Sequence, residues 1–145
     1  CLPFAEEPLV TLASIAGLVK PGGYLLMSSS HPAFAGEWLR LEEDEEGVFL
    51  ESYFRPRPDV RISADGENTV VSQFVSMPDV VNTLIQCGFH ILRLEEPEPP
   101  SLDPYDPEDA QERVPYGSTD WLQMYPVLQR VPVVYIIKAQ RAIDS

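Results

Sequence analysis

One histidine lies where a predicted strand ends, a place where catalytic side chains are often found. His31 follows the predicted strand at residues 24–28 and two serines, and it precedes Pro32. Because open α/β sheets bind ligands beyond the carboxyl ends of their strands, an imidazole here is a candidate general acid or base. The alternative is a histidine that only hydrogen-bonds the turn before Pro32. His90 opens a later predicted strand, and we interpret it as structural.

Aromatic side chains in the first half of the chain are candidates for a substrate pocket, because small-molecule sites are lined mostly by apolar and aromatic groups. The predicted substrate-binding residues are Phe34, Trp38, Tyr53 and Phe54, with Phe74 as a further candidate. The alternative is that these residues form a small hydrophobic core of the segment that carries them. That alternative is favoured for at least half of them.

Metal ligation and thiol chemistry are not indicated by the residue pattern. No cluster of His, Cys and Asp has the spacing of a metal site, and the acidic run at 42–46 lacks the pattern of a calcium loop. Cys1 and Cys87 do not make a disulfide framework, so reduced thiols in the cytoplasm are the simpler interpretation. Glu96 could face the site, although we favour a solvated carboxylate at a strand end.

The charge balance limits the partners that the chain can bind. Its 145 residues include 10 Lys and Arg and 23 Asp and Glu, which gives a formal net charge of −13. A chain this acidic lacks the basic stripe that binds phosphates, which argues against nucleic acid and against an anionic membrane surface. It has no run of 18 apolar residues, so no membrane-spanning helix is expected. Apolar residues make up 44% of the chain, enough to bury a core.

A helix, a turn and a strand are predicted ahead of His31. Apolar residues at three- and four-residue spacing predict an amphipathic helix over residues 7–19. The sequence Lys-Pro-Gly-Gly at 20–23 then predicts a type II turn, with glycine at the third position, where φ must be positive. Residues 24–28 are apolar on both faces, which is typical of a central strand in a helix-covered sheet.

The segment 33–75 interrupts this alternation and is predicted to be an inserted β-rich cap. Short strands are predicted at 38–41, 48–54, 60–63 and 69–75, the last two joined by a hairpin at 64–67. The acidic run at 42–46 is predicted to be a solvated loop.

The remainder of the chain resumes an α/β pattern. Residues 76–79 resemble a capping box with Asp in place of Glu, and they precede an amphipathic helix that ends before Gly88. Strands are predicted at 89–95 and 131–138. The second is apolar on both faces and is therefore expected inside the sheet. The proline- and acid-rich segment 97–130 is predicted to cross the surface irregularly, with a short helix or turn at its end.

Four segments in this order resemble the C-terminal half of a class I S-adenosylmethionine-dependent methyltransferase. Residues 18–26 resemble the family's turn from helix to fifth strand, and residues 30–34 resemble the His-Pro ending of that strand in a small-molecule branch. Residues 79–89 resemble the next helix, which the family usually follows with a Glu-Pro pair, here Glu96-Pro97. Residues 131–137 resemble the closing antiparallel strand.

The resemblance implies both a fold and an activity. The fold would be the C-terminal half of a doubly wound, Rossmann-like sheet, forming one partial domain over 1–145, with the last strand between the fifth and the sixth. The activity would be methyl transfer from S-adenosylmethionine to a small-molecule acceptor. In that setting His31 would be the catalytic residue, and Cys1 and Leu2 would lie at the edge of the cofactor site. Related sequences often carry a His-Arg pair where this chain has Phe74-Val75, which leaves a polar role there in doubt.

The cofactor-binding half of the family's pattern has no counterpart in the chain. The family's glycine-rich loop follows its first strand, and an acidic residue after the second strand binds the ribose, but Gly22-Gly23 follows a helix instead. The chain also opens on Cys1 rather than Met, so a processed or truncated start is expected. We therefore expect the isolated chain to be inactive, and to self-associate or to pair with a missing N-terminal half. The alternative function is a non-catalytic half-domain that serves as a protein-interaction module.

Overall fold

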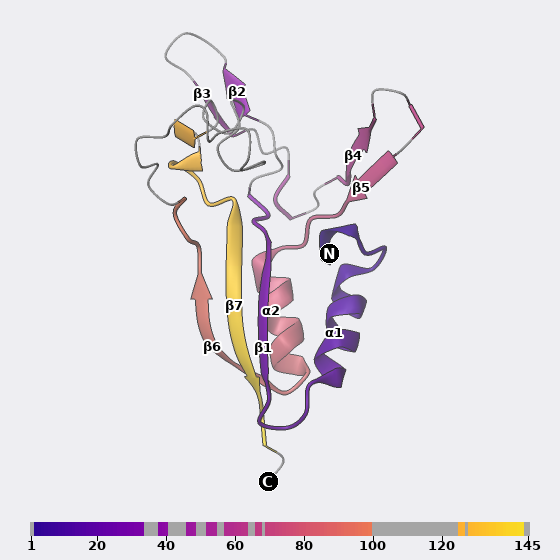
Figure 1. Cartoon of the computed structure of the whole chain (residues 1–145), viewed down its shortest axis with the longest axis vertical. Coiled ribbons are helices and arrows are strands. Elements are labelled where there is room, and N and C mark those ends of the chain that lie inside the picture. Colours follow the sequence, from indigo (N-terminus) through magenta and orange to yellow (C-terminus); the bar gives the residue numbers. More distant parts are fainter. Residues whose placement is uncertain are drawn as a thin grey trace, which may run out of the picture.

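The structure, a computed structural model, describes residues 2–33, 38–40, 46–48, 52–54, 57–63, 66–67, 69–99, 125–126 and 128–143. Within these ranges a three-stranded sheet carries two helices, and two separate strand pairs lie beyond one end of the sheet (Figure 1). Among the helices in these ranges, none combines the length and the apolar character needed to cross a membrane.

The start of the chain folds largely as predicted. A 3-10 helix, η1 (Leu2–Phe4), precedes α1 (Pro8–Leu18), which has proline in its first turn, where a missing N–H leaves no hydrogen bond unmade. The predicted type II turn is confirmed: Gly22 has φ of 74°, and the Gly23 N–H donates to the Lys20 carbonyl at 2.8 Å. Strand β1 (Tyr24–Ser30) follows directly.

The second helix and the strands after it are also present. Ser76 caps α2 (Met77–Gln86): its hydroxyl oxygen accepts from the Asp79 N–H at 3.3 Å and the hydroxyl donates to the Asp79 carboxylate at 2.7 Å. The chain turns at Gly88, whose φ is 81°, into β6 (Phe89–Glu95). The last strand is β7 (Val134–Arg141). It begins three residues later than predicted, and Pro132, which has no N–H to donate to a ladder, lies in the part that is not strand.

The order of the sheet is β1-β7-β6, with β7 antiparallel to both neighbours. The expectation that the last strand lies between the other two is therefore confirmed. Strand β1 has the apolar residues typical of a central strand, but within the described part of the chain it pairs only with β7 and lies at the edge of the sheet, as expected for a chain without the neighbouring parallel strand. Ser29 and Ser30 extend it beyond its predicted end because they pair with Tyr135 and Val134.

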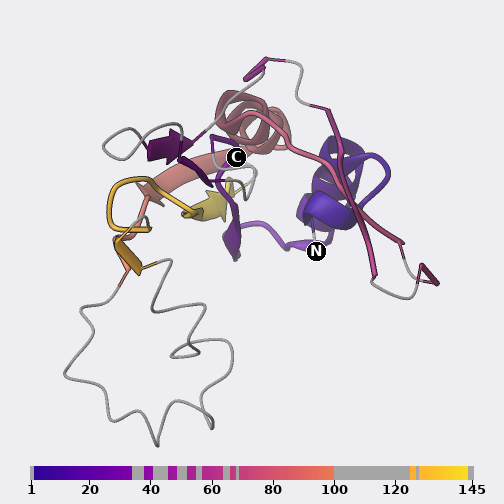
Figure 2. The ribbon, with the colours of Figure 1, turned by 90° about the horizontal axis from the view of Figure 1, so that it is seen from above.

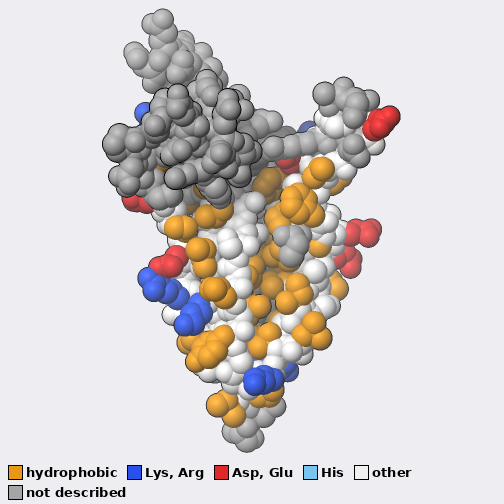
Figure 3. Space-filling model, in the orientation of Figure 1, with side chains coloured by type: hydrophobic (Ala, Val, Ile, Leu, Met, Phe, Trp, Pro, Cys, Tyr) orange, Lys and Arg blue, Asp and Glu red, His pale blue; other side chains and the backbone are white. Residues whose placement is uncertain are grey.

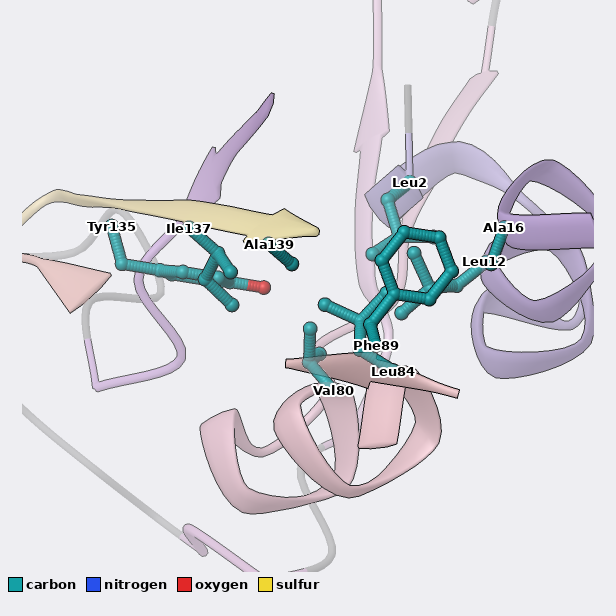
Figure 4. Close-up of a cluster of buried hydrophobic side chains, with 9 residues drawn as sticks. All are labelled: Leu2, Leu12, Ala16, Val80, Leu84, Phe89, Tyr135, Ile137 and Ala139. Atoms are coloured by element: carbon teal, nitrogen blue, oxygen red, sulfur yellow. The ribbon is translucent and has the colours of Figure 1, made fainter. Parts of the chain in front are cut away.

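Both helices pack on the same side of the sheet (Figure 2). The core between these layers consists of Leu2, Leu12, Ala16, Val80, Leu84, Phe89, Tyr135, Ile137 and Ala139 (Figure 4). On β7, alternate residues face this core. The residues that point the other way lie beside Tyr24 and Leu26 of β1, which are 60% and 71% exposed. The described helices thus cover one face only, and the doubly wound arrangement stays a prediction.

The predicted cap region contains two short antiparallel pairs. Strands β4 (Asp59–Ile62) and β5 (Thr69–Ser72) form the expected hairpin, with Gly66 at φ of 74° in its turn. Strands β2 (Trp38–Arg40) and β3 (Glu46–Val48) form the other pair. Here the prediction was wrong in part: Glu46 belongs to a strand rather than to a solvated loop, and residues 52–54 are not strand. The pairing of Arg40 with Glu46 sets the strand position, which apolar content alone did not reveal.

Candidate functional site

The topology brings two polar residues to the same end of the sheet. Strands β1 and β6 both run antiparallel to β7, so they are parallel to each other and their carboxyl ends lie at one edge. His31 is the first residue after β1, and Glu96 is the first residue after β6. The order of the strands therefore places two residues that are 65 positions apart at the same edge of the sheet, on either side of β7.

His31 and Glu96 are in direct contact. The imidazole Nε2 lies 3.0 Å from the Glu96 Oε1, and the Ala33 N–H donates to Nδ1 at 3.1 Å. The His31 backbone N–H donates to the Val133 carbonyl at 2.9 Å, which ties the histidine to the start of β7. The side chain is buried, with the residue only 7% exposed, whereas the Glu96 side chain is 48% exposed.

These contacts define the tautomer of the imidazole. Because Nδ1 accepts a hydrogen bond from the Ala33 backbone, it carries a lone pair, and the proton of the neutral ring must be on Nε2. The Nε2–H then donates to the Glu96 carboxylate. A carboxylate that orients a histidine through one nitrogen, with the other nitrogen available for proton transfer, is the arrangement used by general bases in hydrolases. In this structure the second nitrogen is occupied by the Ala33 amide.

A buried tyrosine lies against the histidine. The Tyr135 ring meets the His31 ring edge-on, with 6.4 Å between centroids and 83° between planes. Burial raises the pKa of the Tyr135 hydroxyl, and its side-chain hydrogen bond with Ser29 lowers that pKa by a smaller amount. The phenol therefore stays protonated at neutral pH, and it supports the site by packing and hydrogen bonding rather than by charge.

Two hollows flank this end of the sheet. One of about 170 Å³ is lined by Glu96, Pro97, Glu98, Leu128, Gln129, Arg130, Val131 and Pro132. The other, of about 10 Å³, is large enough for about one water molecule, and is lined by Leu2, Pro3, Ser29, Ser30, Gln73, Phe74, Val75 and Tyr135. Glu96 lines the larger hollow, whereas His31 lines neither of the two.

The structure places the predicted site residues unevenly. His31 lies at the sheet edge as expected, and its bond with Ala33 across Pro32 is the turn contact that the alternative interpretation predicted. Leu2 belongs to the hydrophobic core. Tyr53 and Phe54 contact each other edge-to-face, with 5.5 Å between ring centroids, and Phe54 is 89% exposed. Their role in substrate binding stays a prediction.

Three further predicted site residues have no described side chain. Cys1 and Phe34 lie outside the described residues, and for Trp38 only the backbone in β2 is described. Phe74 lines the smaller hollow next to Tyr135. The cap as a cover of the site therefore remains an expectation.

Glu96 is the functional candidate that sequence reasoning undervalued. It was interpreted as a solvated carboxylate at a strand end, and its side chain is indeed 48% exposed directly after β6, but it also pairs with a buried imidazole. One signal could have pointed to it, because Glu96 stands directly after a predicted strand that runs parallel to the strand before His31. The partner became visible only with the placement of β7 between the two.

No metal site and no cofactor loop emerge from the described residues. Within them, no group of three or more His, Cys, Asp and Glu side chains could hold a metal ion. The Gly22 N–H donates to Arg141 and the Gly23 N–H to Lys20, in a turn that precedes β1 and so lies at the opposite end of that strand from His31. These two amides are bonded within the protein and do not fit a nucleotide-like cofactor.

Comparison with solved structures supports the fold. The chain superposes on a candidate S-adenosylmethionine-dependent methyltransferase from Listeria monocytogenes with a TM-score of 0.68 and 20% identity, and on an S-adenosylmethionine-dependent methyltransferase from Mesorhizobium loti with a TM-score of 0.62 and 21% identity. The chain therefore shares part of the fold of these two structures. Each superposition covers 97% of this chain but only 58% of the other, so the chain spans little more than half the length of these structures. No protein-family model and no curated protein sequence matches the chain.

The resemblance predicted from the sequence is thus confirmed at the level of the methyltransferase fold. The position of β7 between β1 and β6 agrees with what that resemblance implied. At 20% and 21% identity the likeness concerns the fold, and the chemistry has to be argued from the residues themselves.

Proposed function

We propose that the chain is the acceptor-side part of an S-adenosylmethionine-dependent methyltransferase that acts on a small molecule. The observation that carries the proposal is the His31–Glu96 pair, which lies at the carboxyl edge of the sheet in a methyltransferase fold. Ligands of open α/β sheets bind beyond this edge. The acidic net charge of −13 is consistent with a small acceptor rather than nucleic acid. We further propose that the protein is cytoplasmic, because its two cysteines do not make a disulfide framework.

The chemistry of such a reaction asks little of the protein beyond alignment and exclusion of water. The methyl donor supplies the reactive sulfonium when it is bound. This chain's own residues would orient the acceptor near β1 and β6 and accept its proton where the acceptor must lose one. A buried imidazole is suited to the second task.

The test is an assay of the natural gene product that contains this chain. S-adenosylmethionine is supplied with a panel of small acceptors, one each of phenol, aliphatic alcohol, primary amine and thiol, and S-adenosylhomocysteine is measured. We expect acceptor-dependent product for one class, and a loss of most of that activity in His31→Ala. Absence of turnover with every class, from a protein that binds the methyl donor, would count against a small-molecule acceptor.

A second candidate function is a protein-interaction module, and one feature favours it. The outer edge of β1 has no strand partner within the described ranges, and such an edge can pair with a strand of another chain. The two functions differ in a simple measurement. If the natural gene product shows no binding of S-adenosylhomocysteine but captures a second chain through this edge, the module is the better description.

A further inference from the structure

We propose that Gln73 is a positioning residue that ties the hairpin β4–β5 to the segment before α1, and that this tie transmits ligand binding at the carboxyl edge of the sheet to the hairpin. The inference rests on the proposed function for the identity of the ligand, which is the methyl donor or its product. It concerns a residue outside the His31–Glu96 pair.

The tie consists of two hydrogen bonds from Gln73, the first residue after β5. Its backbone N–H donates to the Pro3 carbonyl at 2.6 Å, and its side-chain Nε2 donates to the Glu6 carbonyl at 2.8 Å. Pro3 lies in η1, and Glu6 lies between η1 and α1. Gln73 therefore holds two points of a segment that is far away in the sequence.

The hairpin depends on such an attachment, because its own apolar face is not packed. Val60 and Ile62 alternate on β4, and Val71 pairs with Val60, so the three side chains share one face. They are 55%, 65% and 44% exposed, respectively. Figure 1 shows the hairpin extending away from the three-stranded sheet, with β5 beside η1, which it contacts. A hairpin of two isolated strands is at best marginally stable in water, so its position depends on what holds its base.

The tie lies at the edge of the sheet where α/β folds bind ligands. The helix η1 contacts β1, and its Leu2 belongs to the core. Gln73 lines the smaller hollow together with Ser29 and Ser30, the last two residues of β1. Because ligands of open α/β sheets bind beyond the carboxyl ends of the strands, a ligand bound there lies next to the segment that Gln73 holds.

The consequence is a coupling between ligand and hairpin. A ligand that restricts the segment before α1 also restricts the base of the hairpin, and by reciprocity a restrained hairpin raises the affinity for the ligand. Without the side-chain bond of Gln73, the two parts move more independently. This coupling distinguishes a positioning role from a structural one, because a loss of stability alone does not make the hairpin insensitive to the ligand.

The first experiment measures hydrogen exchange by mass spectrometry in the natural gene product without ligand. Gln73→Met and Gln73→Glu keep the length of the side chain but remove the donor. We expect exchange in β4 and β5 to become about three- to tenfold faster, as loss of one neutral hydrogen bond implies. Gln73→Lys should exchange like the wild type, because its ammonium can donate to the Glu6 carbonyl. Unchanged exchange of the hairpin in the two variants without a donor would overturn the proposal.

Gln140→Met is the matched control. The Gln140 side chain also donates from Nε2 to a backbone carbonyl, that of Gly22 at 3.0 Å, but in the turn before β1. This variant should leave exchange in the hairpin unchanged, and an equal acceleration by Gln140→Met and Gln73→Met would overturn the proposal. Exchange in α2, where Val80 and Leu84 are buried, reports whether each variant is folded.

The second experiment repeats the measurement with saturating S-adenosylhomocysteine. In the wild type and in Gln140→Met, exchange in β4 and β5 should slow by about fivefold or more, the lower end of the usual coupling between two sites. In Gln73→Met the hairpin should exchange at the same rate with and without the ligand. A wild-type hairpin that does not respond to bound S-adenosylhomocysteine, or an equal slowing in Gln73→Met, would overturn the proposal.

The outcomes separate this inference from the proposed function. If S-adenosylhomocysteine slows exchange of the hairpin through Gln73 but no small acceptor is methylated, the tie stands and the proposed function fails. If methyl transfer proceeds but the Gln73 variants exchange like the wild type, the proposed function stands and the role of Gln73 is refuted. If S-adenosylhomocysteine does not bind at all, both the proposed function and the transmission of ligand binding are refuted.

Discussion

Tyr135 is a buried phenol whose ionisation is linked to stability. Burial raises the pKa of its hydroxyl above 10.0, and the Ser29 hydrogen bond offsets only part of this. At a pH above 10 the unfolded chain therefore releases this proton before the folded chain does. Stability from Tyr135 is fully present below pH 10 and is lost as the pH rises through the folded pKa.

We expect this linkage to be measurable by replacing the hydroxyl. In urea unfolding between pH 8 and 11, a range set around the ordinary tyrosine value, the free energy of unfolding of the wild type should fall more steeply above pH 10 than that of Tyr135→Phe. Tyr24→Phe serves as the control, because Tyr24 is exposed. Equal slopes for wild type and Tyr135→Phe would contradict the buried ionisation.

How far residue roles follow from sequence depends on how local their surroundings are. The position of His31 at a strand end was predictable, because the Lys-Pro-Gly-Gly turn before β1 and Pro32 after it are local signals. Its partner Glu96 was not predictable in the same way. The contact joins residues on either side of the inserted strand β7, and strand order is a property of the tertiary fold.

At the scale of elements, two glycines in different settings have opposite requirements. Gly22 occupies the third position of the turn before β1 with φ of 74°, and an added Cβ would lie 3.3 Å from Ile143. Gly17 lies within α1, and nothing stands within 4 Å of the position of an added Cβ. The first needs a left-handed backbone, and the second lowers helix stability because of its chain entropy.

We therefore predict opposite effects of the same substitution. Gly22→Ala should lower the free energy of unfolding by about 1–2 kcal/mol, because an L-residue is strained in the left-handed region. Gly17→Ala should raise it by about 0.5–1 kcal/mol. Urea denaturation followed by circular dichroism measures both. A Gly22→Ala variant as stable as the wild type would contradict the need for a left-handed residue in the turn. A Gly17→Ala variant that is less stable than the wild type would contradict the prediction for α1.

The elements that were predicted well have local signals at their ends, whereas β3, which was predicted poorly, has none. Ser76 and Gly88 bound α2, and both were visible in the sequence. The segment that contains β3 has no such boundary signal. The position of β3 is set by its pairing with β2 (Trp38–Arg40). A pattern of apolar residues cannot locate a strand whose position depends on its partner.

At the scale of the whole molecule, the main feature is the face of the sheet that neither α1 nor α2 covers within the described residues. Seen from the open side, hydrophobic side chains spread over the sheet and towards α1, while charged side chains lie at the margins (Figure 3). Leu26 is 71% exposed there and lies beside Lys138 on β7. An apolar face next to an unpaired strand edge is a surface that favours association.

We expect the chain to self-associate, in a manner that depends on this face. Sedimentation velocity at increasing concentration should show a growing population of larger species, and Leu26→Glu should reduce it, because the new carboxylate lies beside Lys138 and resists transfer from water. Leu18→Glu is the matched control, because Leu18 is exposed at the end of α1 instead. Equal reduction by both variants would mean that added charge, rather than this face, controls association.

The isolated chain should also fail to bind the methyl donor's product. The glycine turn before β1 uses its amides within the protein, since Gly22 bonds to Arg141 and Gly23 to Lys20, and it lies at the far end of β1 from His31. Leu2, the nearest predicted cofactor residue, is committed to the core. On the proposed function, we therefore expect the described residues to contact the acceptor rather than the donor's adenosine or amino-acid end. Isothermal titration of the chain with S-adenosylhomocysteine should give no binding heat, whereas the natural gene product should bind. Micromolar binding by the chain itself would place a donor site within these 145 residues and would contradict this prediction.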